Sequence, residues 1–299
     1  MERVASGLDL RHVASAVAAL AFTHEAARLM LCRMAVPDPA PLVATPPHLL
    51  HFRISHYNEK VRWALDHKRW PHTREALTPG FHHVRVRWLT GQNQLPVLIL
   101  DGAPHVGSAR ILELIEARRP DPPLFPEDPA LRRRALALQA TFDDEVAPAV
   151  RRLFWSTYLP RPAHATAMAT AGASSAVRAA FRVAFPLMRP VFHWNLAANR
   201  EANDAARAVL NRAIDRVEAE IGPSGYLVGE RFGVADLSVA AVMTAILRPP
   251  EFPYPLPEPW PEELVDLRAA IAARPGCQWV FEIYRRHRDP SAELPRPEA

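Results

Sequence analysis

Three side chains that can move a proton or stabilise an anion stand at consecutive positions. They are Ser55, His56 and Tyr57, which supply a hydroxyl, an imidazole and a phenol. A hydroxyl immediately before a helix can donate a hydrogen bond to an anion, and the N–H groups and dipole of the helix N-terminus stabilise the same charge. The position equally suits a serine that only caps the helix. A lone loop histidine is commonly just solvated, so an anion site and a plain helix start both remain open.

The residues around this triplet predict a strand that runs directly into a helix. Within 49–54, Leu50, Phe52 and Ile54 alternate with polar residues, which is strand periodicity. Residues 59–68 (EKVRWALDHK) place apolar side chains at helical spacing. A strand, a short polar turn and a helix form half of a βαβ unit.

A hairpin and a second helix follow after the less regular stretch 69–95. Residues 96–100 (PVLIL) form an apolar run that ends in Asp-Gly, and 103–106 (APHV) form the next one. Asp-Gly between two short apolar runs predicts a β-hairpin. From Ser108 to Arg119 the apolar residues return to helical spacing. The sequence therefore predicts a β-α-β-β-α unit.

Beyond Pro129 the pattern is helical, with predicted runs at 130–158, about 164–184, 200–221, 234–247 and 262–286. The Pro-rich stretch 249–261 must be a loop. Residues 181–196 are apolar nearly all round and contain two prolines, which indicates a kinked helix or lid. This segment fits a pocket wall, a dimer surface or plain core.

The fold class that results is α/β plus all-α, with a small mixed domain before a helical one. We expect a helical or disordered N-terminal extension, the small domain, a Pro-rich linker, the helical domain and a disordered tail, over residues 1–47, 48–119, 120–129, 130–286 and 287–299.

Composition excludes several classes of function. The 299 residues are 49% hydrophobic and 23% charged, with a net charge of +4, and the basic residues lie beside acids without a long cationic block. We therefore expect no nucleic-acid partner. No stretch of 18 apolar residues occurs, so we expect no membrane partner and a cytoplasmic location.

The spacing of the cysteines and histidines does not favour a metal site or a disulfide framework. Cys32 and Cys277 form neither a CxxC nor a metal-ligand spacing. Eight of the 13 histidines lie between His48 and His105, but they fall on different elements and no HExxH motif is present. We expect no metal site and a reducing compartment.

Four motifs, in order, resemble the cytosolic glutathione transferases. They are ISHYNEKVRWAL, GQNQLPVLILDG, GSARILELIE and YLVGERFGVADLSVAA, at 54–65, 91–102, 107–116 and 226–241. The resemblance covers about residues 48–286 and is to the serine-type, bacterial-like members. It implies a thioredoxin-like domain that binds glutathione, then a helical domain that holds a small apolar electrophile.

The resemblance also implies roles for the turn residues. Ser55 lies six residues before Val61, as the catalytic serine does in serine-type members. Its hydroxyl would stabilise the glutathione thiolate, which is the nucleophile. Tyr57 is the alternative donor. His56, where many members carry proline, would donate to the thiolate or take a substrate proton.

The resemblance extends to glutathione binding. Pro96 matches the family's cis-proline, and Leu95, the residue before it, would offer its backbone to the cysteinyl part. Gln94 would reach the glycyl carboxylate, and Ser108 the γ-glutamyl carboxylate. Gly107 stands where the family has Asp or Glu, so the ligand's ammonium lacks its usual partner unless the acidic cluster 143–145 supplies one.

The helical domain supplies candidates for the rest of the site. Phe154, Trp155 and Tyr158 would wall the electrophile pocket, although an aromatic stripe is more often core. Gly233 and Asp236 occupy the family's capping-box positions and serve folding. The family assembly implies a two-fold homodimer. Two functions stay open: a glutathione transferase, and a noncatalytic module of this fold that binds a ligand or a partner protein.

Overall fold

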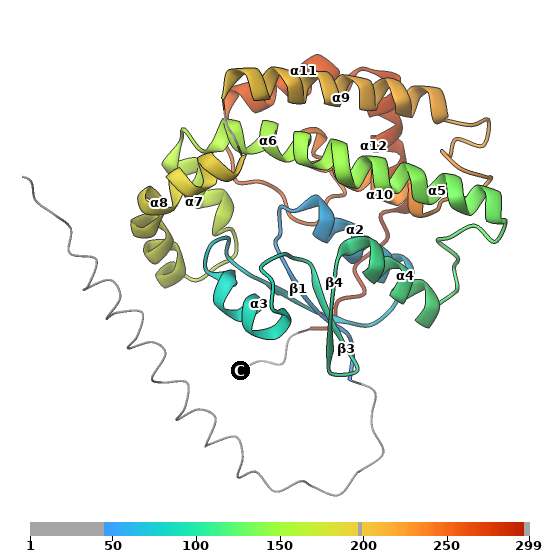
Figure 1. The fold of residues 1–299 in the computed structure, drawn as a ribbon, viewed down its shortest axis with the longest axis horizontal. Helices are drawn as coiled ribbons and strands as arrows, with labels where there is room; N and C mark the ends of the chain where they lie inside the picture. The colour runs from blue at the N-terminus through green and yellow to red at the C-terminus, as the bar shows by residue number, and fades with distance from the viewer. Residues whose placement is uncertain (1–44, 197–198, 296–299) are drawn as a thin grey trace, which may run out of the picture. The chain divides into compact units, whose positions relative to one another are not determined.

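The computed structural model describes residues 45–196 and 199–295 of the chain (Figure 1). The N-terminal extension predicted over residues 1–47 lies outside the described residues except for its last three. All elements below belong to the compact unit that begins at Thr45.

The first domain is built on a four-stranded mixed sheet in the order β2-β1-β3-β4. Its strands are β1 (His48–His51), β2 (Thr73–Ala76), β3 (Val97–Leu100) and β4 (Ala103–Val106). β1 pairs parallel with β2 and antiparallel with β3, and β3 and β4 form the predicted hairpin. This is a thioredoxin-like sheet, and it confirms the fold class that the sequence predicts.

Three helices complete this domain: α2 (His56–His67), α3 (His82–Thr90) and α4 (Ser108–Arg118). α2 and α4 pack against each other, and they bury Val61, Leu65, Ile111 and Ile115 completely. The sequence predicts α2 and α4, but it misses β2 and α3, so the unit is β-α-β-α-β-β-α rather than β-α-β-β-α.

The second domain is helical throughout, as predicted. Its elements are α5 (Pro129–Thr141), a π-helical turn η1 (Phe142–Val146), α6 (Ala147–Tyr158), α7 (Pro162–Ala169), α8 (Ser175–Leu196), α9 (Arg200–Glu220), α10 (Val234–Leu247), α11 (Glu262–Ala272) and α12 (Pro275–His287). The backbone runs from α5 through η1 into α6 without a loop. α8 continues as helix through both of its prolines.

Helix α10 lies at the centre of the molecule. Every one of its residues is buried, and it packs against α2, α5, α6 and α12. Asp236 accepts hydrogen bonds from the backbone N–H groups of Gly233 at 2.9 Å and Leu227 at 2.8 Å. This confirms the capping role of Asp236, which fixes where the central helix begins.

The chain after α12 returns to the first domain. The N–H of Leu294 donates to the His72 carbonyl at 2.7 Å, and the N–H of His72 donates to the Ala292 carbonyl at 3.3 Å. Residues 288–295 therefore lie along the start of β2, which differs from the disordered tail that the composition predicts.

Candidate functional site

Strand register brings three of the predicted site segments to one end of the sheet. Leu50 of β1 pairs with Val97 of β3, and Val97 pairs with Val106 of β4. The turn after β1, the residues before β3 and the residues after β4 therefore meet at the same edge. Ser55, Pro96 and Ser108 come from these three segments.

Ser55 is the N-cap residue of α2, with φ −81° and ψ 127°. Its carbonyl accepts the N–H of Glu59 at 2.9 Å, which starts the helix. Its side chain forms no capping hydrogen bond, and the residue is half-buried. The hydroxyl thus stands at a helix N-terminus without serving the helix, which leaves it available to another acceptor.

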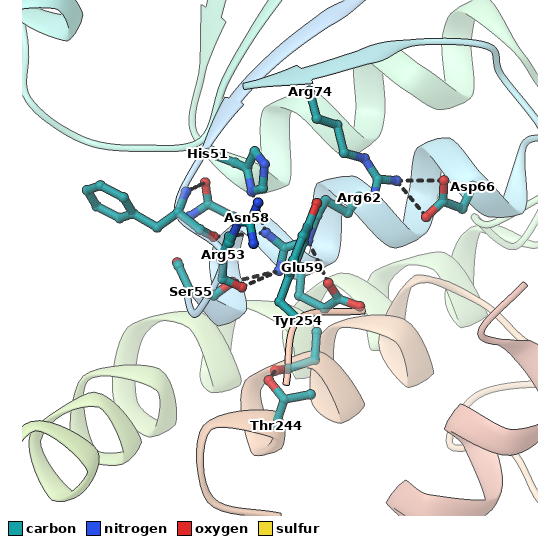
Figure 2. Close-up of polar contacts among 12 residues, drawn as sticks. His51, Arg53, Ser55, Asn58, Glu59, Arg62, Asp66, Arg74, Thr244 and Tyr254 are labelled. Carbon is teal, nitrogen blue, oxygen red and sulfur yellow. Dashed lines mark hydrogen bonds and ion pairs between the residues drawn. The ribbon is translucent and has the colours of Figure 1, made fainter. Parts of the chain in front are cut away.

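Arg62 holds the turn that carries Ser55. Its buried guanidinium donates to the carbonyls of Phe52 at 2.9 Å and Arg53 at 3.2 Å, and it lies 2.9 Å from Nδ1 of His51 (Figure 2). Glu59 balances its charge across 2.7 Å. Because Arg has no acceptor atoms, His51 must accept at Nδ1.

Further along α2 the acidic side chains are fully paired. Asp66 contacts Arg74 at 2.6 Å and Arg288 at 2.8 Å, and Arg288 also contacts Glu59 at 2.7 Å. These side chains are almost entirely buried. Burial by itself raises the pKa of Asp66, but Arg74 and Arg288 outweigh it and hold that pKa below its usual range. This ionic cluster ties α2 to β2 and to the segment after α12.

Of the other two candidates in the turn, Tyr57 is already hydrogen-bonded and His56 is buried. The phenol of Tyr57 donates to the Asp143 carbonyl at 2.7 Å, and burial followed by the charge of Asp143 raises its pKa to about 12. His56 is buried, and its Nε2 atom has no hydrogen-bond partner among the described residues. Burial, then the charges of Arg151 and Lys60, lower its pKa to about 3, so its ring is neutral.

The residues predicted to bind glutathione differ in accessibility. The Leu95–Pro96 peptide bond is cis, as the sequence predicts. Pro96 is buried, Leu95 is half-buried and Gln94 is exposed. Ser108 is buried as the first residue of α4.

Two family models match this chain. The model for the glutathione S-transferase N-terminal domain matches residues 49–123, and that for the C-terminal domain matches 200–273. The chain belongs to the glutathione S-transferase family. No protein with curated annotation matches it at a significant level.

Several solved structures share its fold. A glutathione S-transferase from Rhodospirillum rubrum is 19% identical, with 78% of this chain and 91% of that chain covered, at a TM-score of 0.52. A beta-etherase from Sphingobium is 20% identical, with coverage of 80% and 99% and a TM-score of 0.54. A glutathione S-transferase from Methylobacterium radiotolerans, in complex with glutathione sulfonate, is 22% identical, with coverage of 85% and 100% and a TM-score of 0.50.

In this glutathione S-transferase family protein, one acid of the cluster 143–145 is already paired and so does not replace the side chain that Gly107 lacks. Lys60 contacts the Asp143 carboxylate at 2.6 Å, and the Lys60 side chain is completely buried. Burial raises the pKa of Asp143, while the Lys60 ammonium opposes that rise. Asp143 is therefore occupied, whereas Asp144 and Glu145 are exposed.

Gly107 itself has a backbone that favours glycine. Its φ is 84° and its ψ is 113°, a conformation that other residues rarely adopt. A Cβ atom added there would meet no atom within 4 Å. Strain of the backbone, rather than lack of space, would oppose the acid that the family usually carries here.

The three aromatic residues predicted to wall the electrophile pocket differ in burial. Phe154 and Tyr158 are buried and stack on each other with ring centroids 4.7 Å apart. Trp155 is half-buried and stacks on Phe192 of α8 at 5.7 Å. Phe154 and Tyr158 thus take the core alternative that the sequence leaves open.

Two hollows bear on where a ligand would fit. A cavity of about 30 Å³ lies between the Ser55 turn and the α7–α8 connection, and it is lined by segments 52–54, 76–79 and 168–173. This is room for about one water molecule. A larger pocket of about 560 Å³ is lined by segments 123–135 and 220–236, and none of the predicted site residues contributes to it. Within residues 45–196 and 199–295, no three histidine, cysteine or acidic side chains converge on a metal position.

Proposed function

We propose that this chain binds glutathione at the end of the sheet formed by the Ser55 turn, Leu95–Pro96 and Ser108, and activates its thiol for attack on a small apolar electrophile. The family membership and the shared end of the three segments support this proposal. Transferases of the same fold were crystallised with glutathione sulfonate and with glutathione.

One observation carries the catalytic part: the Ser55 hydroxyl forms no capping bond, while the Tyr57 phenol is bound to the Asp143 carbonyl. A free thiol titrates near ~8.5 and is mostly protonated at neutral pH. A hydrogen bond to a charged sulfur supplies about 1.5–3 kcal/mol. That energy lowers a pKa by about one to two units. Ser55, aided by the N-terminus of α2, is thus the group proposed to hold the thiolate.

In the same proposal, the backbone of Leu95 aligns the cysteinyl part and the N-terminus of α4 at Ser108 holds a carboxylate. Gln94 is exposed at the same edge and is assigned to the glycyl carboxylate. His56, neutral and buried, is assigned no proton transfer, because its lowered pKa keeps it unprotonated across physiological pH. Trp155 is the aromatic assigned to the electrophile, since it is only half-buried.

A second function is favoured by a separate observation. Gly107 supplies no carboxylate for the ligand's ammonium, and Asp143 is held by Lys60. Weak glutathione binding without turnover would make the chain a noncatalytic module of this fold. The cavity beside the turn, of about 30 Å³, also favours the noncatalytic module, because ligand pockets usually have volumes of ~300 Å³ or more.

Calorimetry with glutathione, paired with initial rates on an aryl halide, separates the two functions. The transferase proposal expects saturable binding and turnover in the wild type. Ser108→Ala is expected to weaken binding, and Ser55→Ala to slow turnover at unchanged binding. Binding without turnover of any electrophile supports the noncatalytic module, and absence of glutathione binding contradicts the transferase proposal.

We further infer a two-fold homodimer, on the model of the family assembly, in which the small domain packs on the partner's helical domain. Sedimentation velocity at several protein concentrations checks this. A monomer whose sedimentation does not depend on concentration contradicts it.

A further inference from the structure

Arg53 carries a positive charge two residues before Ser55, and no acid of the described residues pairs with it. Its side chain is half-buried, and its Nε atom is buried with no hydrogen-bond partner in the described part of the chain. Arg62 and Arg74, by contrast, contact carboxylates at 2.7 and 2.6 Å. A guanidinium has five N–H donors and no acceptor, so Arg53 can still bind an incoming anion.

Packing, rather than a carboxylate, holds the Arg53 guanidinium in place. A Cβ atom added at Gly172 would lie 2.2 Å from Cζ of Arg53, so the guanidinium lies against the Gly172 backbone. Gly172 has a φ of 74°, a conformation that favours glycine. The same Cζ atom lies 5.2 Å from the centre of the Tyr254 ring, which is a cation–π distance. Figure 2 shows Arg53 and Tyr254 beside the Ser55 turn.

Arg53 and Gly172 both line the cavity of about 30 Å³ between the Ser55 turn and the α7–α8 connection. Every other residue that lines it is uncharged. A space for about one water molecule accepts only the end of a ligand. One oxygen of a planar carboxylate fits such a space better than a bulkier tetrahedral phosphate, and the rest of the ligand would lie outside it.

One wall of this cavity is specific to this chain's helical domain. Residues 168–173 come from the end of α7 and the connection to α8. They lie outside 49–123 and 200–273, so neither family model describes this wall. Among the described residues no helix, α8 included, is both long enough and apolar enough to cross a bilayer.

We propose that Arg53 binds the carboxylate of an otherwise apolar electrophile, and so determines which substrates the site accepts. This inference rests on the proposed function and names the substrate class of the same site. Arginine binds planar carboxylates through two parallel N–H···O bonds. Two residues of chain span at most ~7 Å, so a carboxylate on Arg53 would lie close to the thiol that Ser55 is proposed to hold. The helical wall is the side that the family resemblance assigns to the electrophile.

Calorimetry with two unreactive probes tests this assignment. 4-Nitrobenzoate and 4-nitrobenzamide share one ring and one shape but differ in charge, and neither carries a leaving group. With saturating glutathione, the wild type should bind the benzoate about ten- to hundredfold more tightly, as one charge-assisted contact allows. Equal binding of the two probes, or binding of neither, overturns the proposal.

Two kinds of variant locate the contact. Arg53→Met keeps the length of the side chain without its charge and should bind both probes equally. Arg87→Met makes the same change at an exposed arginine of α3 and should keep the wild-type preference. Gly172→Ala should displace the guanidinium and weaken the preference, whereas Gly91→Ala should not, because Gly91 has the same φ of 74° with no atom within 4 Å of an added Cβ. A preference that survives Arg53→Met contradicts the assignment.

The same titrations separate this inference from the proposed function. A benzoate preference that depends on Arg53, in a protein that turns over no electrophile, supports the carboxylate site and contradicts the transferase. Turnover with equal binding of the two probes does the reverse. Glutathione binding should be unchanged in Arg53→Met. If that variant instead weakens glutathione binding, Arg53 holds a carboxylate of the tripeptide and the assignment to the electrophile is wrong.

Discussion

The two ends of helix α2 use polar residues in opposite ways. Toward its C-terminal end, Asp66 is surrounded by Arg74 and Arg288, and its carboxylate is satisfied at distances of 2.6 and 2.8 Å. At its N-terminal end, the Ser55 side chain makes no capping bond, and the Nε2 atom of His56 is buried with no hydrogen-bond partner in the part of the chain that the structure describes. Both ends belong to one helix, and they differ in how their polar groups are paired.

The contrast indicates which polar groups hold the structure and which remain for chemistry. A buried charge costs several kcal/mol unless it is paired, so the Asp66 cluster must be complete in the resting fold. A hydroxyl at a helix N-terminus costs little when it is left free, because the helix N–H groups can be solvated. Arg62 joins the two regions, since it pairs with Glu59 and also holds the carbonyls of the Ser55 turn.

The largest effect is expected at the paired end. Asp66→Ala leaves Arg74 and Arg288 without that carboxylate, so the free energy of unfolding should fall by about 3–5 kcal/mol. Urea unfolding followed by circular dichroism measures this. Glu113→Ala removes an exposed acid from α4 and serves as the control, with a change near zero. A loss below ~1 kcal/mol for Asp66→Ala would show that the ionic cluster does not hold the fold.

The next largest effect is expected at the N-terminal end of α2, at Ser55. It should appear in the rate of turnover and not in the free energy of unfolding. Ser55→Ala removes the proposed donor to the thiolate, and kcat/KM at neutral pH should fall about ten- to hundredfold while unfolding is unchanged. Raising the pH should restore much of the rate, because the thiol then ionises without help. Steady-state kinetics across pH measure both. If the variant instead loses stability at full activity, Ser55 acts as a cap.

The two ends should also respond to acid in different pH ranges. His56 has a pKa of about 3 in the fold, whereas an unfolded chain protonates it near ~6.5. Between these values the unfolded state binds more protons, so stability falls as the pH drops below ~6.5, by up to about 1.4 kcal/mol per unit. The folded-state pKa of Asp66 is lowered, so Asp66 stays charged to lower pH. Its contribution to the free energy of unfolding is lost only as the pH falls below ~3.9.

The matching experiment is urea unfolding of the wild type, His56→Gln and His83→Gln at mildly alkaline and mildly acidic pH. His56→Gln should flatten the loss of stability with acid. Burial lowers the pKa values of His72 and His287 to about 4, so these two residues should still cause part of the loss of stability with acid in His56→Gln. His83 is exposed, and its variant should behave as the wild type does. Identical slopes for all three proteins would contradict the assignment of a neutral, buried His56.

The smallest effect is expected at Tyr57. Tyr57→Phe removes only the hydrogen bond to the Asp143 carbonyl, so stability should fall by about 0.5–1.5 kcal/mol. Turnover should change by less than about twofold, because the phenol is not the proposed donor. Parallel unfolding and rate measurements check this. A large loss of rate that high pH restores would transfer the catalytic role from Ser55 to Tyr57.

Much of the fold follows from the sequence because its elements obey simple periodicity. Strands β1 and β3 and helices α2 and α4 bury apolar positions, the Asp-Gly turn marks the β3–β4 hairpin, and α10 is a long apolar run that is buried throughout. Strand β2 is missed because its buried residue is Arg74, whose charge is satisfied by Asp66 from another element. Helix α3 is missed because it buries only His82 and Val86. Long-range pairing of this kind leaves no local signal.

The sequence anticipates which segments meet at one end of the sheet, but not the electrostatics around them. The resemblance to the glutathione transferases, together with the turn before a helix, selects Ser55, Pro96 and Ser108, and the strand register brings their segments together. Two ion pairs of the site join residues that are far apart in the chain: Lys60 with Asp143, and Arg288 with Glu59. A lone Lys or Arg in the sequence does not reveal its partner, so the occupied state of Asp143 could not be anticipated.

The ionisation of bound glutathione tests the central claim most directly. Ultraviolet difference absorption of the thiolate, titrated against pH with saturating glutathione, gives the pKa of the bound thiol in the wild type and in Ser55→Ala. The account predicts a wild-type value about one to two units below the ~8.5 of a free thiol, and a return toward that value in Ser55→Ala. A bound thiol that titrates like the free one in the wild type, or a lowered pKa that survives Ser55→Ala, would contradict the account.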